Sequence, residues 1–125
     1  MVLAEFKRLD SGNIGLVMKG HSSMKMRGQF IVCAGISAVF YTLVGYLANT
    51  FGTKFKIFKI KSGDVDIECD GLGSEAFRMA CIGLLQLSEL YPGEIKVINK
   101  VWDSKLCALS DLNIFNFNVE ELAYE

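Results

Sequence analysis

A histidine and a cysteine in this sequence are suited by type to nucleophilic catalysis. His21 is the only histidine, and Cys33 follows it twelve residues later. A cysteine thiolate can attack a carbonyl carbon, while an imidazole takes the thiol proton and later protonates a leaving amine. A structural interpretation stays open, because cysteine is a common small core residue and a lone histidine is usually a surface or capping group. The pair is therefore a candidate Cys–His dyad.

The charge pattern assigns the two residues to different elements. No residue from Gln29 to Thr53 is charged at neutral pH, which predicts a buried helix that begins near Phe30 after a loop. Cys33 would then lie in the first turn, where the positive end of the helix dipole stabilises a thiolate. The free amides at the same helix start, near Val32 and Cys33, are suited to hold an oxyanion.

The predicted loop from Ser22 to Gln29 separates the two candidate catalytic residues. Its glycine permits hinge conformations and its methionines can adapt to apolar substrate side chains, so the loop is suited to be a lid. An ordinary surface loop fits the same composition. The candidate substrate-binding residues are those of the loop and a serine one helical turn after the cysteine: Ser22, Met24, Met26, Gly28 and Ser37.

The uncharged stretch is also long enough to be a membrane span. However, polar or small residues recur every four positions in line with Cys33, namely Ser37, Tyr41, Gly45 and Asn49. Such a stripe favours the buried helix of a soluble protein beside a cleft. A membrane-associated protein remains as an alternative, but we expect no membrane partner.

Composition limits the other classes of function. With 125 residues and 51% apolar residues, the chain is long enough for one domain with a real core. The net charge of −1 gives no general attraction to nucleic acid. With one histidine and no Cys-x-x-Cys spacing, we expect no metal, no cofactor and no disulfide framework. The N-terminal residues lack the apolar core of a signal peptide, which predicts a cytoplasmic location.

Two predicted hairpins account for most of the strands. Val2 to Arg8 and Ile14 to Lys19 flank a turn, and the second strand would deliver His21. In the stretch 54–70, four lysines face four acidic residues across a Ser62-Gly63 turn, provided that a bulge lies near Ile57. The apolar pairs would be Ile60–Val65, Phe58–Ile67 and Phe55–Cys69, on a face of the hairpin that packs against the core. The matching acidic row favours a solvated, ion-paired face over an RNA site.

A second helix follows, with Ser74 as its predicted N-cap and Pro92-Gly93 at its end. Gly83 would allow this helix to approach a neighbour closely. The residues from Glu94 to Trp102 are predicted to form the last strand. We therefore predict an α+β fold of order ββαββαβ, with two helices on one face of a largely antiparallel sheet. Residues 1–102 form the domain, and residues 103–125 form a C-terminal extension of it.

The run from Gly20 to Ala38, GHSSMKMRGQFIVCAGISA, resembles the signature of the ribosomal-processing cysteine protease family Prp (YsxB-like). In that signature a Gly-His pair precedes a loop, a glycine and a helix opening IVCA, with a serine four residues after the cysteine. A looser similarity continues through Ile82-Gly83-Leu84 and Tyr91-Pro92. One departure is Phe30, because the family usually carries aspartate at that position, where its carboxylate would suit the N-cap of the helix.

The resemblance implies a cytoplasmic cysteine endopeptidase that removes a short N-terminal extension from a large-subunit ribosomal protein. It implies Cys33 as nucleophile, His21 as base, the extension peptide as partner and a homodimer as the assembly. An alternative of another class is a non-catalytic module of the same fold that binds the ribosomal protein or its peptide without cutting it.

Overall fold

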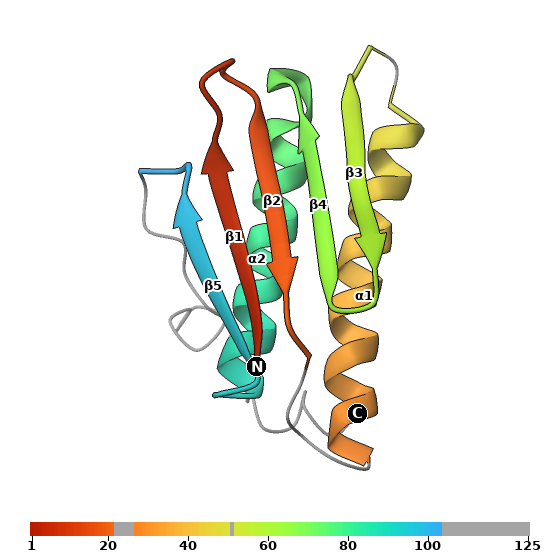
Figure 1. Ribbon diagram of the computed structural model, residues 1–125, viewed down its shortest axis with the longest axis vertical. Coiled ribbons are helices and arrows are strands. Elements are labelled where there is room, and N and C mark those ends of the chain that lie inside the picture. The colour runs from red at the N-terminus through yellow and green to blue at the C-terminus, as the bar shows by residue number, and fades with distance from the viewer. Residues whose placement is uncertain (22–26, 51, 104–125) are drawn as a thin grey trace, which may run out of the picture.

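The protein is a two-layer domain, described by a computed structural model over residues 1–21, 27–50 and 52–103 (Figure 1). The elements follow the order ββαββαβ with one short 3₁₀ turn, η1, before the second helix. In chain order they are β1 (Val2–Arg8), β2 (Ile14–Lys19), α1 (Arg27–Ala48), β3 (Phe55–Lys61), β4 (Asp64–Cys69), η1 (Gly71–Gly73), α2 (Ser74–Leu90) and β5 (Ile95–Lys100).

The five strands form one sheet in the order β3-β4-β2-β1-β5. All neighbours are antiparallel except β1 and β5, which run parallel. Both helices lie on the same face of the sheet, with α1 behind β3 and β4 and α2 behind β1 and β2 (Figure 1). The predicted α+β class, element order and one-sided helix layer are confirmed.

Alternation along β1 and β2 builds the core between the two layers. Val2, Ala4 and Phe6 of β1 are buried, and Phe6 is completely buried. Its ring meets the ring of Phe77 on α2 edge-on, at 6.3 Å between centroids, and lies 5.8 Å from the ring of Trp102. Apolar burial of this kind is the main force that holds a helix layer on a sheet.

The β3–β4 hairpin has the predicted register with one correction. Phe55 pairs with Cys69, and Ile60 pairs with Val65. The register shifts between Ile57 and Lys59, so Ile57, rather than Phe58, lies opposite Ile67. Phe58 is thus the extra residue of the bulge.

The prediction that β3 buries one face is wrong for its middle and end. Ile57 and Ile60 are 46% and 40% exposed, and Phe58 is 58% exposed. The reason is position: β3 is the edge strand, so it has a neighbouring strand on one side only. By contrast Val65, Ile67 and Cys69 of the inner strand β4 are buried.

Helix α1 begins at Arg27 and ends at Ala48, so it starts three residues before the predicted Phe30. Its sheet-facing residues Val32, Phe40, Leu43 and Leu47 are buried. The part from Ile31 to Ala48 is apolar and long enough to cross a membrane by length and composition, with mean hydropathy 1.9, and 22% of it is buried. Packing on the sheet explains why the inner face of this helix is apolar.

Helix α2 begins at Ser74, and its N-cap is Gly73 rather than the predicted Ser74. The side-chain cap lies earlier, where the carboxylate of Asp70 accepts a hydrogen bond from the Leu72 amide at 3.1 Å. The close approach predicted at Gly83 is confirmed, because a Cβ there would lie 3.2 Å from Val39 Cγ2 of α1. The two helices therefore touch through a residue without a side chain.

Candidate active site

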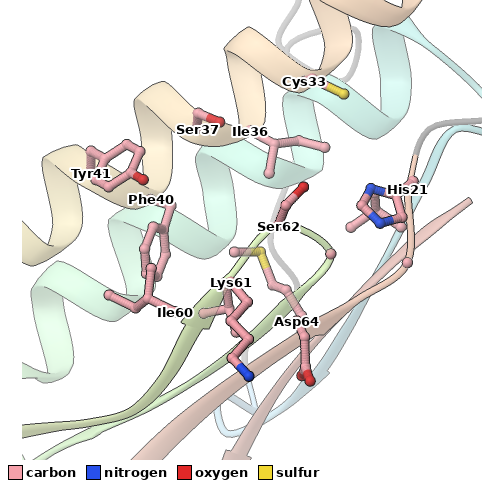
Figure 2. Close-up of a pocket in the computed structure, with 15 residues that line it drawn as sticks. His21, Cys33, Ile36, Ser37, Phe40, Tyr41, Ile60, Lys61, Ser62 and Asp64 are labelled. Carbon is pink, nitrogen blue, oxygen red and sulfur yellow. The ribbon is translucent and has the colours of Figure 1, made fainter.

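A pocket of about 320 Å³ opens where α1, the end of β2 and the β3–β4 turn meet. His21 and Cys33 both line it. Figure 2 shows the Cys33 sulfur on α1 and the His21 imidazole on the segment after β2, with both side chains directed to the same end of the pocket. The fold thus brings together the two residues that the sequence singled out for nucleophilic chemistry.

Cys33 is the seventh residue of α1 and is half-buried. Because the helix begins at Arg27, the first four amides without intrahelical partners are those of residues 27–30. The amides of Val32 and Cys33 lie inside the helical hydrogen-bond ladder. The predicted oxyanion site at these two amides is therefore wrong, and so is the predicted first-turn position of the thiol.

His21 directly follows the end of the β2–β4 pairing. Lys19 pairs with Asp64, and the next residue, Gly20, donates its amide to the carbonyl of Gly63 at 3.0 Å. Gly20 has φ +100, and a Cβ there would collide with the carbonyl oxygen of Met1. This backbone conformation favours glycine, and it turns the exposed His21 toward the pocket.

The other predicted site residues divide into three groups. Ser37 lies one turn after Cys33 and lines the same pocket, as does Tyr41 one turn further on. Gly28 belongs to α1, so the predicted loop cannot extend to Gln29. Ser22, Met24 and Met26 lie outside the described residues, and their role stays a prediction.

Phe30 is the fourth residue of α1. An N-cap precedes the first helical residue and has non-helical backbone angles. Position 30 is therefore not the N-cap of this helix, and the capping role inferred for the family aspartate there is wrong for this chain.

The β3–β4 turn is the part of the pocket that the sequence did not assign to the site. Lys61, Ser62, Gly63 and Asp64 line the pocket, and in Figure 2 the Ser62 hydroxyl points into it from below Cys33. Asp64 also forms an ion pair with Lys59 at 3.1 Å. The Ser62-Gly63 turn itself was predicted, but its place beside His21 follows from the β2–β4 pairing.

The remaining wall of the pocket is apolar. It is formed by side chains from the sheet and from the inner side of α1, namely Val2, Met18, Ile36, Phe40, Ile60 and Val65. An apolar wall next to a nucleophile and a base is suited to hold an apolar side chain of a bound substrate.

The model of the cysteine protease Prp family matches residues 1–96. The chain belongs to the Prp cysteine protease family. Comparison with curated protein sequences finds no match.

Solved structures have the same fold. The ribosomal processing protease Prp from S. aureus, solved with a covalently linked product peptide, is 23% identical, with a TM-score of 0.69 over 80% of this chain and 100% of that chain. The same protease, solved with a substrate peptide, is 24% identical at a TM-score of 0.65, with the same coverage. The protein SMU.848 from Streptococcus mutans is 21% identical at a TM-score of 0.63, over 82% of this chain and 99% of that one.

Within the family fold, the cysteines of this chain differ in environment. Burial raises the pKa of Cys69 to about 12, with Asp70 and Glu68 adding to the shift, and raises the pKa of Cys81 to about 11. Both thiols therefore stay protonated at neutral pH. Cys33, by contrast, lines the pocket. The described residues contain no cluster of three potential metal ligands.

Proposed function

We propose that this chain is a cysteine endopeptidase that removes a short N-terminal extension from a large-subunit ribosomal protein. The observation that carries the proposal is the shared pocket of Cys33 and His21, in a chain that belongs to a cysteine protease family. The S. aureus protease, solved with substrate and product peptides, supports a peptide as the ligand.

The mechanism uses the two residues as one unit. The Cys33 sulfur attacks the scissile carbonyl carbon while the His21 imidazole takes the thiol proton. Collapse of the tetrahedral intermediate breaks the carbon–nitrogen bond, and His21 returns the proton to the leaving amine. Water, with His21 as base, then hydrolyses the thioester and restores the thiol.

The pocket lining favours a substrate with an apolar side chain at the cleavage point. Ile36 and Phe40 from α1 and Ile60 from β3 line the same pocket as the reacting pair. A peptide segment that carries a large apolar residue would bury that residue here, at about 25 cal/mol for each Å² removed from water.

Incubation with a ribosomal protein that bears its N-terminal extension, followed by intact-mass measurement, tests the proposal. We expect the wild-type chain to release the extension, and Cys33→Ala and His21→Ala each to abolish cleavage. The double variant should lose no more than either single one, because the residues act together. Cys81→Ala serves as the control, since it removes a buried thiol that does not line the pocket and should retain cleavage.

The same experiment separates catalysis from binding. A wild-type chain that binds the extension without cutting it would support the non-catalytic binding module instead. A His21→Ala variant that retained most of the wild-type rate would contradict the dyad.

We also propose a cytoplasmic homodimer without direct contact to nucleic acid. The exposed apolar side chains of the edge strand, Ile57 and Phe58, offer a surface that a second copy can cover. Sedimentation equilibrium tests the assembly, and a monomer at micromolar concentration would contradict it.

A further inference from the structure

The β3–β4 turn touches the proposed base directly. Gly63 has φ +76 and lines the pocket beside His21. A Cβ at position 63 would collide with the imidazole Nε2 and would lie only 2.6 Å from Cε1 and 3.0 Å from Cδ2. Three of the five ring atoms of His21 therefore occupy the space that any other side chain at position 63 would need.

Backbone hydrogen bonding fixes the same two segments to each other. The Gly20 amide donates to the Gly63 carbonyl at 3.0 Å. Gly20 directly precedes His21, and Gly63 is the residue that the His21 ring contacts. The β2–β4 ladder from Ile14–Cys69 to Lys19–Asp64 leads into this bond. This bond fixes the backbone one residue before His21 against the turn, so the imidazole moves away only if the bond breaks or if torsions at Gly20 or His21 rotate.

We propose that Gly63 is a positioning residue for His21, and that the absence of a side chain at position 63 sets where the imidazole lies in the pocket. The inference rests on the proposed function in taking His21 as the base for Cys33. Gly63 in the β3–β4 turn thus positions the site together with α1 and the end of β2.

The chain offers a matched control for this inference. Gly12 also lies in a hairpin turn with positive φ, +88, and apart from its two chain neighbours no described residue has an atom within 4 Å of its Cβ position. An alanine at Gly12 or at Gly63 meets the same backbone strain. Only the alanine at Gly63 meets the imidazole as well, so the difference between the two variants isolates the contact with the ring.

The first readout is structural and independent of catalysis. His21 is the only histidine, so its ring C–H signals in a proton–carbon NMR spectrum are assigned without ambiguity. We expect the nuclear Overhauser contacts between the ring and the Gly63 Hα protons to be lost in Gly63→Ala, with displaced ring signals. Gly12→Ala should leave the signals where they are. Unchanged ring signals in Gly63→Ala would overturn the proposal.

The second readout is the rate at which iodoacetamide alkylates Cys33 as a function of pH. General-base assistance commonly contributes about a hundredfold or more, so we expect Gly63→Ala to lose at least about tenfold at neutral pH and to approach the profile of His21→Ala. A profile that matches Gly12→Ala would overturn the positioning role. If His21→Ala itself leaves the wild-type profile unchanged, the dyad fails, while the NMR result still decides the position of the ring.

A second pair of variants covers the case in which alanine prevents folding. Asparagine tolerates positive φ better than most residues with a Cβ, so Gly63→Asn and Gly12→Asn have less backbone strain than the alanine variants. Of the two, only Gly63→Asn places a Cβ against the imidazole. We expect the same displaced ring signals in Gly63→Asn, and wild-type signals there would overturn the proposal.

Discussion

Cys33 differs from the two other described cysteines in what surrounds its sulfur. Cys69 and Cys81 are nearly inaccessible to solvent, and burial raises the pKa of each. Cys33 is half-buried and lines a pocket with His21. Only a thiolate reacts readily with electrophiles, so burial protects Cys69 and Cys81, whereas the sulfur of Cys33 can be reached from the pocket.

At the scale of single residues we therefore predict selective alkylation. Iodoacetamide at mildly acidic to neutral pH should label Cys33 well before Cys69 or Cys81, as measured by peptide mapping of the native protein. Labelling in denaturant is the control, because unfolding should make the three thiols equally reactive. Equal or faster labelling of Cys69 or Cys81 in the native state would remove the assignment of Cys33 as nucleophile.

Among the elements, the connection from β4 to α2 depends on one carboxylate. Asp70 accepts hydrogen bonds from the Leu72 amide at 3.1 Å and from the Lys54 amide at 3.3 Å. It thereby ties the start of the 3₁₀ turn η1 to the residue just before β3. The carboxylate caps η1, whereas α2 begins after Gly73 without a side-chain cap, so the capping predicted for Ser74 is absent.

We predict that Asp70→Ala lowers the free energy of unfolding by roughly 1–2 kcal/mol, since it leaves two backbone donors without their acceptor. Urea denaturation measures the change. Asp70→Asn keeps one acceptor oxygen and should lose less. Asp10→Ala, an exposed aspartate of the β1–β2 turn, is the matched control and should stay within about 0.5 kcal/mol of wild type. An Asp70→Ala variant as stable as Asp10→Ala would contradict this capping role.

For the molecule as a whole, the buried thiols link stability to alkaline pH. Cys69 on β4 and Cys81 on α2 belong to the one core that joins the sheet to the helices. An unfolded thiol titrates near 9.0, whereas the folded thiols keep their protons to a pKa of about 12 and about 11. Above pH 9 the folded state binds more protons than the unfolded state, so stability is complete below that pH and falls as the pH rises.

We predict that the free energy of unfolding falls by about 1 kcal/mol for each buried thiol between pH 9 and pH 10. Urea denaturation in the presence of a reductant, repeated across this range, measures the slope. Cys81→Ala removes one of the two groups and should reduce the slope by about half. A slope that is the same in Cys81→Ala and wild type would show that this thiol does not titrate as its burial requires.

Much of the secondary structure follows from local pattern. The bounds of β1 and β2 were predicted correctly from alternation around a turn, and the hairpin register followed from opposite charges on the two sides of Ser62-Gly63. The bulge was placed within one residue for the same reason. His21 and Cys33 could be chosen because their types, spacing and surrounding motif are properties of the sequence itself.

The tertiary structure decided what lies beside these residues. The start of α1 was misplaced because Arg27, Gly28 and Gln29, which form its first residues, are by type compatible with either loop or helix. The exposure of Ile57 and Ile60 depends on β3 being at the edge of the sheet, which alternation along a strand cannot reveal. The contact of Gly63 with His21 depends on the pairing of β2 with β4. These residues are 42 positions apart in sequence, and they become neighbours only once the two strands pair in this register.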